Sequence, residues 1–227
     1  MKRRTSYQDV PWYRYDALLV RAVRDFVRQA LDGVLVRPGL RVLDVGCGEQ
    51  PLRASVEARG ARYLGVDVSA NPAHTTAALC RADALPFAAA SFDVVLLTEV
   101  LEHVDEPATA IGECARVLRP GGSLIVTVPF MYPLHEEPHD FLRPTAHLLR
   151  RLCDEQGLEV VDLSPLGDTL GAAATLLDHA WSTTRGPAHW ARLGVRMLSF
   201  GLVTAARAAG IGGRSAPVGH GLLARRR

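Results

Sequence analysis

Apolar runs of strand length alternate along most of the chain with longer segments in which apolar residues recur at helical spacing. The expected strands cover residues 41–45, 62–68, 78–82, 92–98, 123–129, 158–164 and 219–226. The expected helices cover residues 14–31, 106–118 and 145–157. This alternation predicts an α/β fold, with a mostly parallel seven-stranded sheet and helices on both faces.

Residues 167–213 break the alternation, because they are rich in alanine and leucine and too long for an ordinary connection. We expect two helices there, at 169–182 and 189–209, inserted before the last strand. The insertion could wall a pocket or pair with a second copy in a homodimer, and the sequence leaves both open. The chain is then one domain, with an N-terminal helical cap (1–37), a core (38–166), the helical insertion (167–213) and a last strand with a basic tail (214–227).

Composition excludes several classes of protein. A net charge of +2 over 227 residues is too small to indicate nucleic-acid binding. The four cysteines form no Cys-x-x-Cys pair, which argues against a disulfide framework and suits a reducing compartment. No secretory signal is evident, and Arg196 and Arg207 interrupt the most apolar stretch before it reaches the length of a membrane span. We therefore expect a cytoplasmic protein.

The stretch "VLDVGCGEQP" (42–51) carries the first chemical signal. A buried strand containing Asp44 passes into a loop in which Gly46 and Gly48 lack side chains, so that a ligand can lie against the backbone. Such loops are common, and a plain tight turn would look the same.

Two further acids indicate an adenosine site. Asp67 ends the next strand, where a carboxylate can accept hydrogen bonds from ribose hydroxyls. Asp83 follows the third strand, where its carboxylate could accept from an adenine amine and the backbone of Ala84 could donate. A dinucleotide loop would need a third glycine where Pro51 stands, and Glu49 would repel phosphates. The zwitterionic methionine tail of S-adenosylmethionine fits this loop better.

Four ordered motifs strengthen this interpretation: "VLDVGCGEQP", "YLGVDVS", "RADALPFAAASFDVVLLTEVLEHV" and "ECARVLRPGGSLIVTVP". Over roughly residues 38–165 the chain resembles the class I S-adenosylmethionine-dependent methyltransferases, of the small-molecule branch, which have a Rossmann-like fold. The resemblance implies S-adenosyl-L-methionine as cofactor. It assigns the methionine portion to Asp44, Gly46, Cys47 and Gly48, the ribose to Asp67, the adenine to Asp83, Ala84, Val68 and Leu85, and the sulfonium surroundings to Thr98 and Glu99.

Methyl transfer needs a base only if the acceptor must lose a proton. The candidates are His103, His135 and His139, with Glu99 and Glu102 nearby in sequence, because a neutral histidine is available near pH 7. Nucleobase acceptors are disfavoured, since "TEVL" stands where amino-methylating relatives carry Asn/Asp-Pro-Pro-Tyr. A small molecule is expected instead: a sugar, a glycolipid precursor or a specialised metabolite.

Residues 135–139 read "HEEPH", which matches the zinc-binding pattern His-Glu-x-x-His. That pattern requires a continuous helix, yet Pro133 and Pro138 bracket the motif, and no third ligand is evident. We therefore expect no metal, and interpret the segment as a substrate loop in which His135, Glu136, His139 and Asp140 orient or deprotonate the acceptor.

Two other functions stay open. A nicotinamide-dependent oxidoreductase would need a hydride-handling group such as Tyr-x-x-x-Lys, but Lys2 is the only lysine. A non-catalytic module could keep the cofactor fold and use the insertion for assembly. Calorimetry with S-adenosylmethionine and NADH distinguishes an oxidoreductase from a methyltransferase. Transfer of labelled methyl groups distinguishes a methyltransferase from a non-catalytic module.

Overall fold

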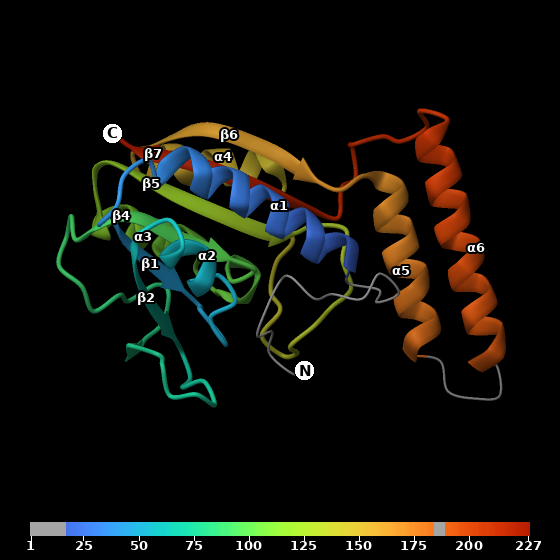
Figure 1. Cartoon of the computed structure of the whole chain (residues 1–227), viewed down its shortest axis with the longest axis horizontal. Helices are drawn as coiled ribbons and strands as arrows, with labels where there is room; N and C mark the ends of the chain where they lie inside the picture. The colour runs from blue at the N-terminus through green and yellow to red at the C-terminus, as the bar shows by residue number, and fades with distance from the viewer. Residues whose placement is uncertain (1–16, 184–188) are drawn as a thin grey trace.

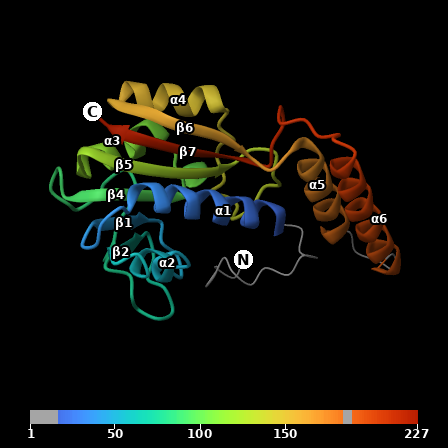
Figure 2. The same ribbon diagram turned by 45° about the horizontal axis from the view of Figure 1, so that its top comes forward.

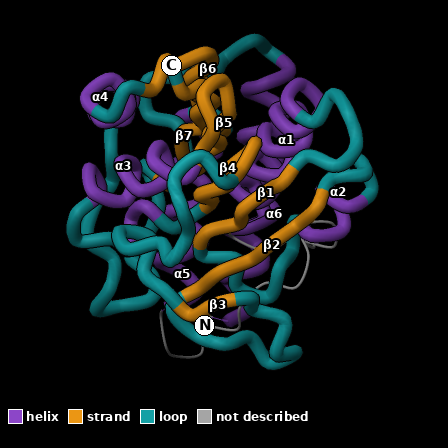
Figure 3. The backbone as a smooth tube through the Cα atoms, turned by 90° about the vertical axis from the view of Figure 1, so that its left-hand side faces the viewer, coloured by secondary structure: helices purple, strands orange, loops and turns teal. Residues whose placement is uncertain are grey.

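Seven strands form one sheet in the order β3-β2-β1-β4-β5-β7-β6 (Figures 1 and 3). The computed structural model describes residues 17–183 and 189–227. The strands are β1 (Arg41–Val45), β2 (Arg62–Asp67), β3 (Ala78–Leu79), β4 (Phe92–Thr98), β5 (Leu118–Pro129), β6 (Leu158–Leu166) and β7 (Gly219–Arg226). The pairs β3–β2, β2–β1, β1–β4 and β4–β5 are parallel, and β7 lies antiparallel between β5 and β6.

Helices cover both faces of the sheet (Figure 2). They are α1 (Ala17–Val34), α2 (Arg53–Glu57), the 3₁₀ turn η1 (Leu101–His103), α3 (Pro107–Val117), α4 (Ala146–Glu155), α5 (Thr169–Thr183) and α6 (His189–Ala208). Alternate residues of each strand point to opposite faces. Leu43 and Leu97 join the core under α3 and α4, whereas Val42 and Leu96 join the core under α1 and α2. Both faces are therefore apolar, as buried parallel strands require.

The predicted fold class is confirmed, and the bounds of β1, β4 and β7 agree with prediction. The strand expected at 123–129 begins earlier, at Leu118, because Leu118 pairs with Phe92 before the register shifts. The short elements α2 and η1 were not predicted. The part of the expected N-terminal cap within the described residues, α1, contacts β5, β6 and β7, whereas residues 1–16 lie outside them.

The insertion forms a helical hairpin, α5–α6, that projects from one end of the sheet (Figures 1 and 2). Its base is closed by Thr169, whose amide and hydroxyl both donate to the carbonyl of Gly213, at 2.9 and 2.8 Å. Several apolar side chains of the hairpin are exposed: Leu176, Leu177, Met197, Leu198 and Leu202. Within the described part of the chain, no helix combines the length and the apolar character that crossing a membrane would require.

Candidate cofactor and acceptor site

The glycine loop after β1 lies against β2 and the segment after β4. The amides of Gly46 and Cys47 both donate to the carbonyl of Val66, at 2.8 and 2.9 Å, which fixes the path of the loop. Gly46 has φ +71°, and a Cβ there would overlap a γ-carbon of Val100. Gly48 has φ +50°, and a Cβ there would meet no atom within 4 Å. Gly46 is therefore required by packing, whereas Gly48 opens onto space that a ligand can enter.

Asp67 is buried at the end of β2 and faces the glycine loop. Its Oδ2 accepts from the amide of Gly48 at 2.9 Å, and its Oδ1 accepts from the amide of Ser69 at 3.1 Å. These bonds orient the carboxylate of Asp67, and an ionised carboxylate can accept several hydrogen bonds at once, including bonds from ribose hydroxyls. This geometry fits the ribose-binding role that the sequence predicts for Asp67.

Asp44 provides the test of whether this site suits a cationic ligand. Its side chain is buried, and Oδ2 accepts from the hydroxyl of Tyr63 at 2.5 Å, but Oδ1 has no hydrogen-bond partner among the described residues. Burial raises the pKa of Asp44 to about 7, against the hydrogen bond from Tyr63 and with the help of the Asp67 charge. A buried acceptor without a donor is costly. An ammonium group such as that of a methionine tail would supply the missing donor, so the residues fit S-adenosylmethionine.

At the predicted adenine end, unlike at Asp44 and Asp67, the carboxylate already has a charged partner. Both carboxylate oxygens of Asp83 accept from Arg81, at 2.8 and 2.6 Å, and the amide of Ala84 donates to the carbonyl of Arg81. Leu85 belongs to the hydrophobic core, whereas Val68 is 66% exposed. Val68 thus offers an apolar surface to a ring, and the roles of Asp83, Ala84 and Leu85 stay predictions.

Several residues that support the cofactor end were not predicted. Asn71 is buried and donates to the carbonyl of Gly48 at 3.2 Å, which holds the loop 71–76 against the glycine loop. From α3, Glu113 accepts from the amide of Leu85 while Arg116 donates to its carbonyl. The signal in sequence was a polar pair, Glu113 and Arg116, one helical turn apart on a helix that is otherwise largely apolar.

At the end of β4, Thr98 is buried and Glu99 has φ +54°. A positive φ is uncommon for a residue other than glycine and is often found at functional sites. The amide of Glu99 donates to the carbonyl of Thr127 at 2.9 Å, so β5 holds this turn in place. The chain then enters η1, which presents Glu102 and His103 at the same edge of the sheet.

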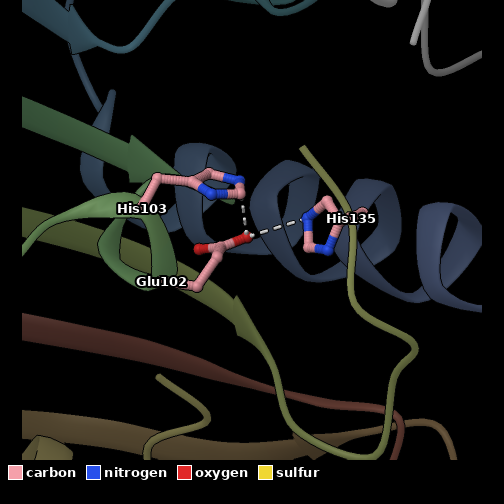
Figure 4. A group of neighbouring side chains, drawn as sticks. All are labelled: Glu102, His103 and His135. Atoms are coloured by element: carbon pink, nitrogen blue, oxygen red, sulfur yellow. Dashed lines mark ion pairs between the residues drawn. The ribbon is translucent and has the colours of Figure 1, made fainter. Parts of the chain in front are cut away.

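Two of the three predicted histidines meet at this edge. The Nε2 atoms of His103 and His135 each lie 3.7 Å from Oε1 of Glu102, whose side chain is fully buried (Figure 4). Burial by itself lowers the pKa of His135, but Glu102 and Asp140 outweigh that effect and leave the pKa above its ordinary value. His139 contributes differently: its ring packs on Phe141, and its backbone carbonyl lies 2.6 Å from Nδ1 of His103.

The segment "HEEPH" is a loop and contains no helix. Asp140, whose side chain is almost fully buried, forms an ion pair with Arg143 and accepts from the amide of His135 at 2.9 Å. Arg143 also donates to the carbonyl of Pro133 at 3.1 Å. The loop is therefore shaped by an aspartate–arginine pair, and its two histidines do not face each other across a helical turn as a zinc protease would require.

A parallel sheet with a glycine loop and two buried acids at the carboxyl ends of β1 and β2 defines a nucleoside-binding α/β protein. A family model described as "Methyltransferase domain" matches residues 43–126. Ubiquinone biosynthesis O-methyltransferases are similar to the chain over part of their length. The protein of Azoarcus sp. is 32% identical, over 59% of this chain and 70% of the relative. The protein of Hahella chejuensis is 37% identical, over 46% of this chain and 48% of the relative.

Solved structures show the same fold. The cyclase SpnF has a TM-score of 0.61 at 22% identity, over 90% of this chain and 81% of its own. Geranyl diphosphate C-methyltransferase from Streptomyces coelicolor has a TM-score of 0.59 at 16% identity, over 99% and 88%. The chain belongs to the class I S-adenosylmethionine-dependent methyltransferases. It spans between about half and 70% of the length of the two curated relatives compared.

Proposed function

We propose that this protein transfers the methyl group of S-adenosylmethionine to a hydroxyl oxygen of a small molecule that carries an apolar portion. The proposal rests on the open space at Gly48, whose amide bonds to the buried Asp67, together with the buried Asp44, which has an acceptor oxygen without a donor among the described residues. The cofactor supplies the methyl group on a sulfonium, which is its own leaving group. Asp44 would bind the amino group and Asp67 the ribose.

An oxygen acceptor is supported by the relatives, which are O-methyltransferases by name. In such a transfer the bond from acceptor oxygen to carbon forms as the carbon–sulfur bond breaks, and the electron pair stays on sulfur. The hydroxyl proton passes to a base, for which His103, His135 and His139 are the predicted candidates. Alignment of the acceptor with the methyl group can supply roughly 7 to 11 kcal/mol of the barrier. The protein's main task is therefore to hold the acceptor in line.

The apolar portion of the acceptor is inferred from the loop 130–145. Met131, Leu134 and Phe141 are exposed on this loop, with Leu134 at 64%, beside the edge where His103 and His135 meet. Exposed apolar side chains on a loop next to a site favour an apolar ligand. The sugar, glycolipid-precursor and specialised-metabolite classes stay predictions, as do the catalytic roles of Glu99, His103, His135 and His139.

Assembly and compartment are also proposals. The exposed leucines of the α5–α6 hairpin are consistent with a homodimer through the insertion, and all four cysteines are free thiols, which suits the reducing cytoplasm.

The test is calorimetry with S-adenosylhomocysteine, followed by transfer of labelled methyl groups to a panel of hydroxylated acceptors that differ in apolar area. We expect cofactor binding, and transfer that improves with apolar area. A protein that binds NADH and neither cofactor form would refute the family function. One that binds cofactor but labels nothing would instead support a non-catalytic module.

A further inference from the structure

Glu102 has no adequate partner for a fully buried carboxylate. Neither of its oxygens has a hydrogen-bond partner among the described residues. Nε2 of His103 and Nε2 of His135 each lie 3.7 Å from the same oxygen, Oε1. That separation is too long for a hydrogen bond. A buried charge is tolerated when it is paired and bonded or coordinates a metal, so this arrangement lacks a component.

The hydrogen bonds on the far side of each ring indicate which nitrogen carries the proton. Nδ1 of His103 lies 2.6 Å from the backbone carbonyl of His139. Nδ1 of His135 lies 3.3 Å from the carbonyl of Pro133 and 3.2 Å from Oδ2 of Asp140. Carbonyl and carboxylate oxygens only accept, so in both rings Nδ1 is the protonated nitrogen.

In a neutral imidazole the other nitrogen then carries a lone pair. With both rings neutral, the Nε2 lone pairs face the carboxylate of Glu102, so three electron-pair donors converge on one point (Figure 4). Histidine ligands of metal ions commonly have this pattern, with the outer nitrogen bonded to a carboxylate or a backbone carbonyl. A cation between the three groups would satisfy all of them.

We propose that Glu102, His103 and His135 bind a divalent transition-metal ion of the zinc class. One ligand atom from each of these residues lies within 4.8 Å of the others. With metal–ligand bonds of about 2.0 to 2.2 Å, ligands of one ion lie roughly 3 to 4 Å apart, so only a small contraction is needed. Two imidazoles and one carboxylate favour zinc or ferrous iron over magnesium or calcium, which prefer oxygen ligands.

This site differs from the one that "HEEPH" suggests. His135 is used, but its partners come from η1, after β4, and His139 contributes its backbone carbonyl as an outer support. From sequence we expect no metal, because no third ligand is evident within the motif and prolines bracket it. Two of the three ligands, Glu102 and His103, come from η1, which the fold brings close to His135.

Three protein ligands leave open positions on the ion, as is typical of catalytic metal sites. Val100, two residues before Glu102, packs against Gly46, so the ion would lie near the cofactor loop. If the proposed function holds, the open positions would take the acceptor hydroxyl and lower its pKa. The binding of the ion itself does not depend on that function.

The experiment uses chelator-treated protein titrated with Co²⁺, which is a spectroscopic substitute for zinc, with visible absorption as the readout. We expect one ion per chain, displaced by Zn²⁺. Glu102→Gln and His135→Ala should each weaken Co²⁺ binding at least about 100-fold. His139→Ala is the matched control on the same loop: it removes a ring that packs on Phe141 and keeps the carbonyl, so Co²⁺ affinity should be unchanged.

Folding is checked in each variant by thermal unfolding and by S-adenosylhomocysteine calorimetry. The site is supported if these variants lose metal affinity and still bind S-adenosylhomocysteine. Absence of Co²⁺ and Zn²⁺ binding in the folded wild type, or binding that survives in both Glu102→Gln and His135→Ala, would overturn it. Metal binding without cofactor binding would leave the site standing and defeat the proposed function instead. If a variant fails to fold, His103→Gln provides the same comparison at the more exposed ring.

Discussion

At the cofactor end of the site, residues 44–50 and 66–69, the backbone groups of the glycine loop are themselves held by β2, Asp67 and Asn71. At the acceptor end, residues 99–103 and 130–145, an ion pair between side chains shapes the loop. At the cofactor end, the amides of Gly46 and Gly48 donate to β2 or to Asp67. At the acceptor end, the Asp140–Arg143 pair shapes a loop without regular structure. Backbone geometry accepts few substitutions, while side-chain contacts can change with sequence. The difference is consistent with a family whose members share one cofactor and differ in the acceptor they methylate.

The largest effect is expected from Gly46→Ala. Its Cβ would overlap Val100, and its φ of +71° is unfavourable for alanine. Overpacking and strain together cost about 2 to 5 kcal/mol, so affinity for S-adenosylhomocysteine should fall at least about 30-fold by calorimetry.

Gly39→Ala is the matched control, because Gly39 has φ +81° with no atom near its Cβ position. It should lower the melting temperature and leave cofactor affinity unchanged. The double variant Gly46→Ala, Val100→Ala should recover part of the binding. Equal losses of affinity in both single variants would show that backbone strain alone, and not the fit of the loop to Val100, decides cofactor binding.

Asp67→Asn should have the next largest effect. The amide keeps the volume but replaces one acceptor oxygen with a donor, so the bond from Gly48 or those to the ribose are lost. Hydrogen bonds to a charged group contribute about 1.5 to 3 kcal/mol, which corresponds to a loss of roughly 10- to 150-fold in cofactor affinity. Calorimetry measures it, with Asp162→Asn on the exposed part of β6 as a control. Unchanged affinity would remove Asp67 from the ribose site.

Cofactor binding should depend on pH through Asp44. Because the pKa of Asp44 is about 7, the residue is increasingly protonated below pH 7 in the free protein and must ionise to accept from an ammonium group. Affinity for S-adenosylhomocysteine should therefore fall as pH falls from 7.5 to 5, approaching about tenfold per unit at the acidic end.

Stability of the free protein should change in the opposite direction. An acid with a raised pKa stabilises the fold fully below its unfolded value of 3.8, and that contribution is lost as pH rises through about 7. Asp44→Asn should remove both dependences. A binding profile that is the same in wild type and Asp44→Asn would contradict this role.

The smallest effect is expected at the acceptor end, from Leu134→Ser. Leu134 is 64% exposed, so the fold should be unaffected. Loss of apolar contact worth about 1 kcal/mol should raise KM for apolar acceptors about fivefold, with kcat and cofactor affinity unchanged. Val36→Ser, at a position 76% exposed outside the site, should change neither constant. An equal rise in KM for polar acceptors would argue against an apolar acceptor portion.

The cofactor end could be predicted from sequence because its residues follow strands in a fixed order. Asp44 and Asp67 lie at the ends of strands whose apolar runs are evident in the sequence, and the carboxyl ends of parallel strands share one edge. The acceptor end could not be predicted in the same way. Whether Glu99 or Glu102 is buried depends on the 3₁₀ turn η1, and the meeting of Glu102 with His135 depends on two separate connections.

Other details depended on contacts that leave no pattern in sequence. Arg81 pairs with Asp83, whose carboxylate is predicted to accept from an adenine amine. Asp140 was expected to act on the acceptor, but its buried side chain pairs with Arg143 and supports the loop. In both cases a charged neighbour two or three residues away competes with the ligand for the carboxylate. Such local ion pairs leave no pattern in sequence, and the predicted roles of these carboxylates stay predictions.

The register between β6 and β7 has a consequence for how the chain can be shortened or lengthened. Leu166 and Gly219, which flank the insertion, are direct partners across the two antiparallel strands. Adjacent antiparallel strands can be joined by a turn of only a few residues. A redesigned chain could therefore replace residues 167–218 with a short hairpin turn and keep the strand order. By the same geometry, this junction can accept inserted segments of different lengths while the sheet stays in register.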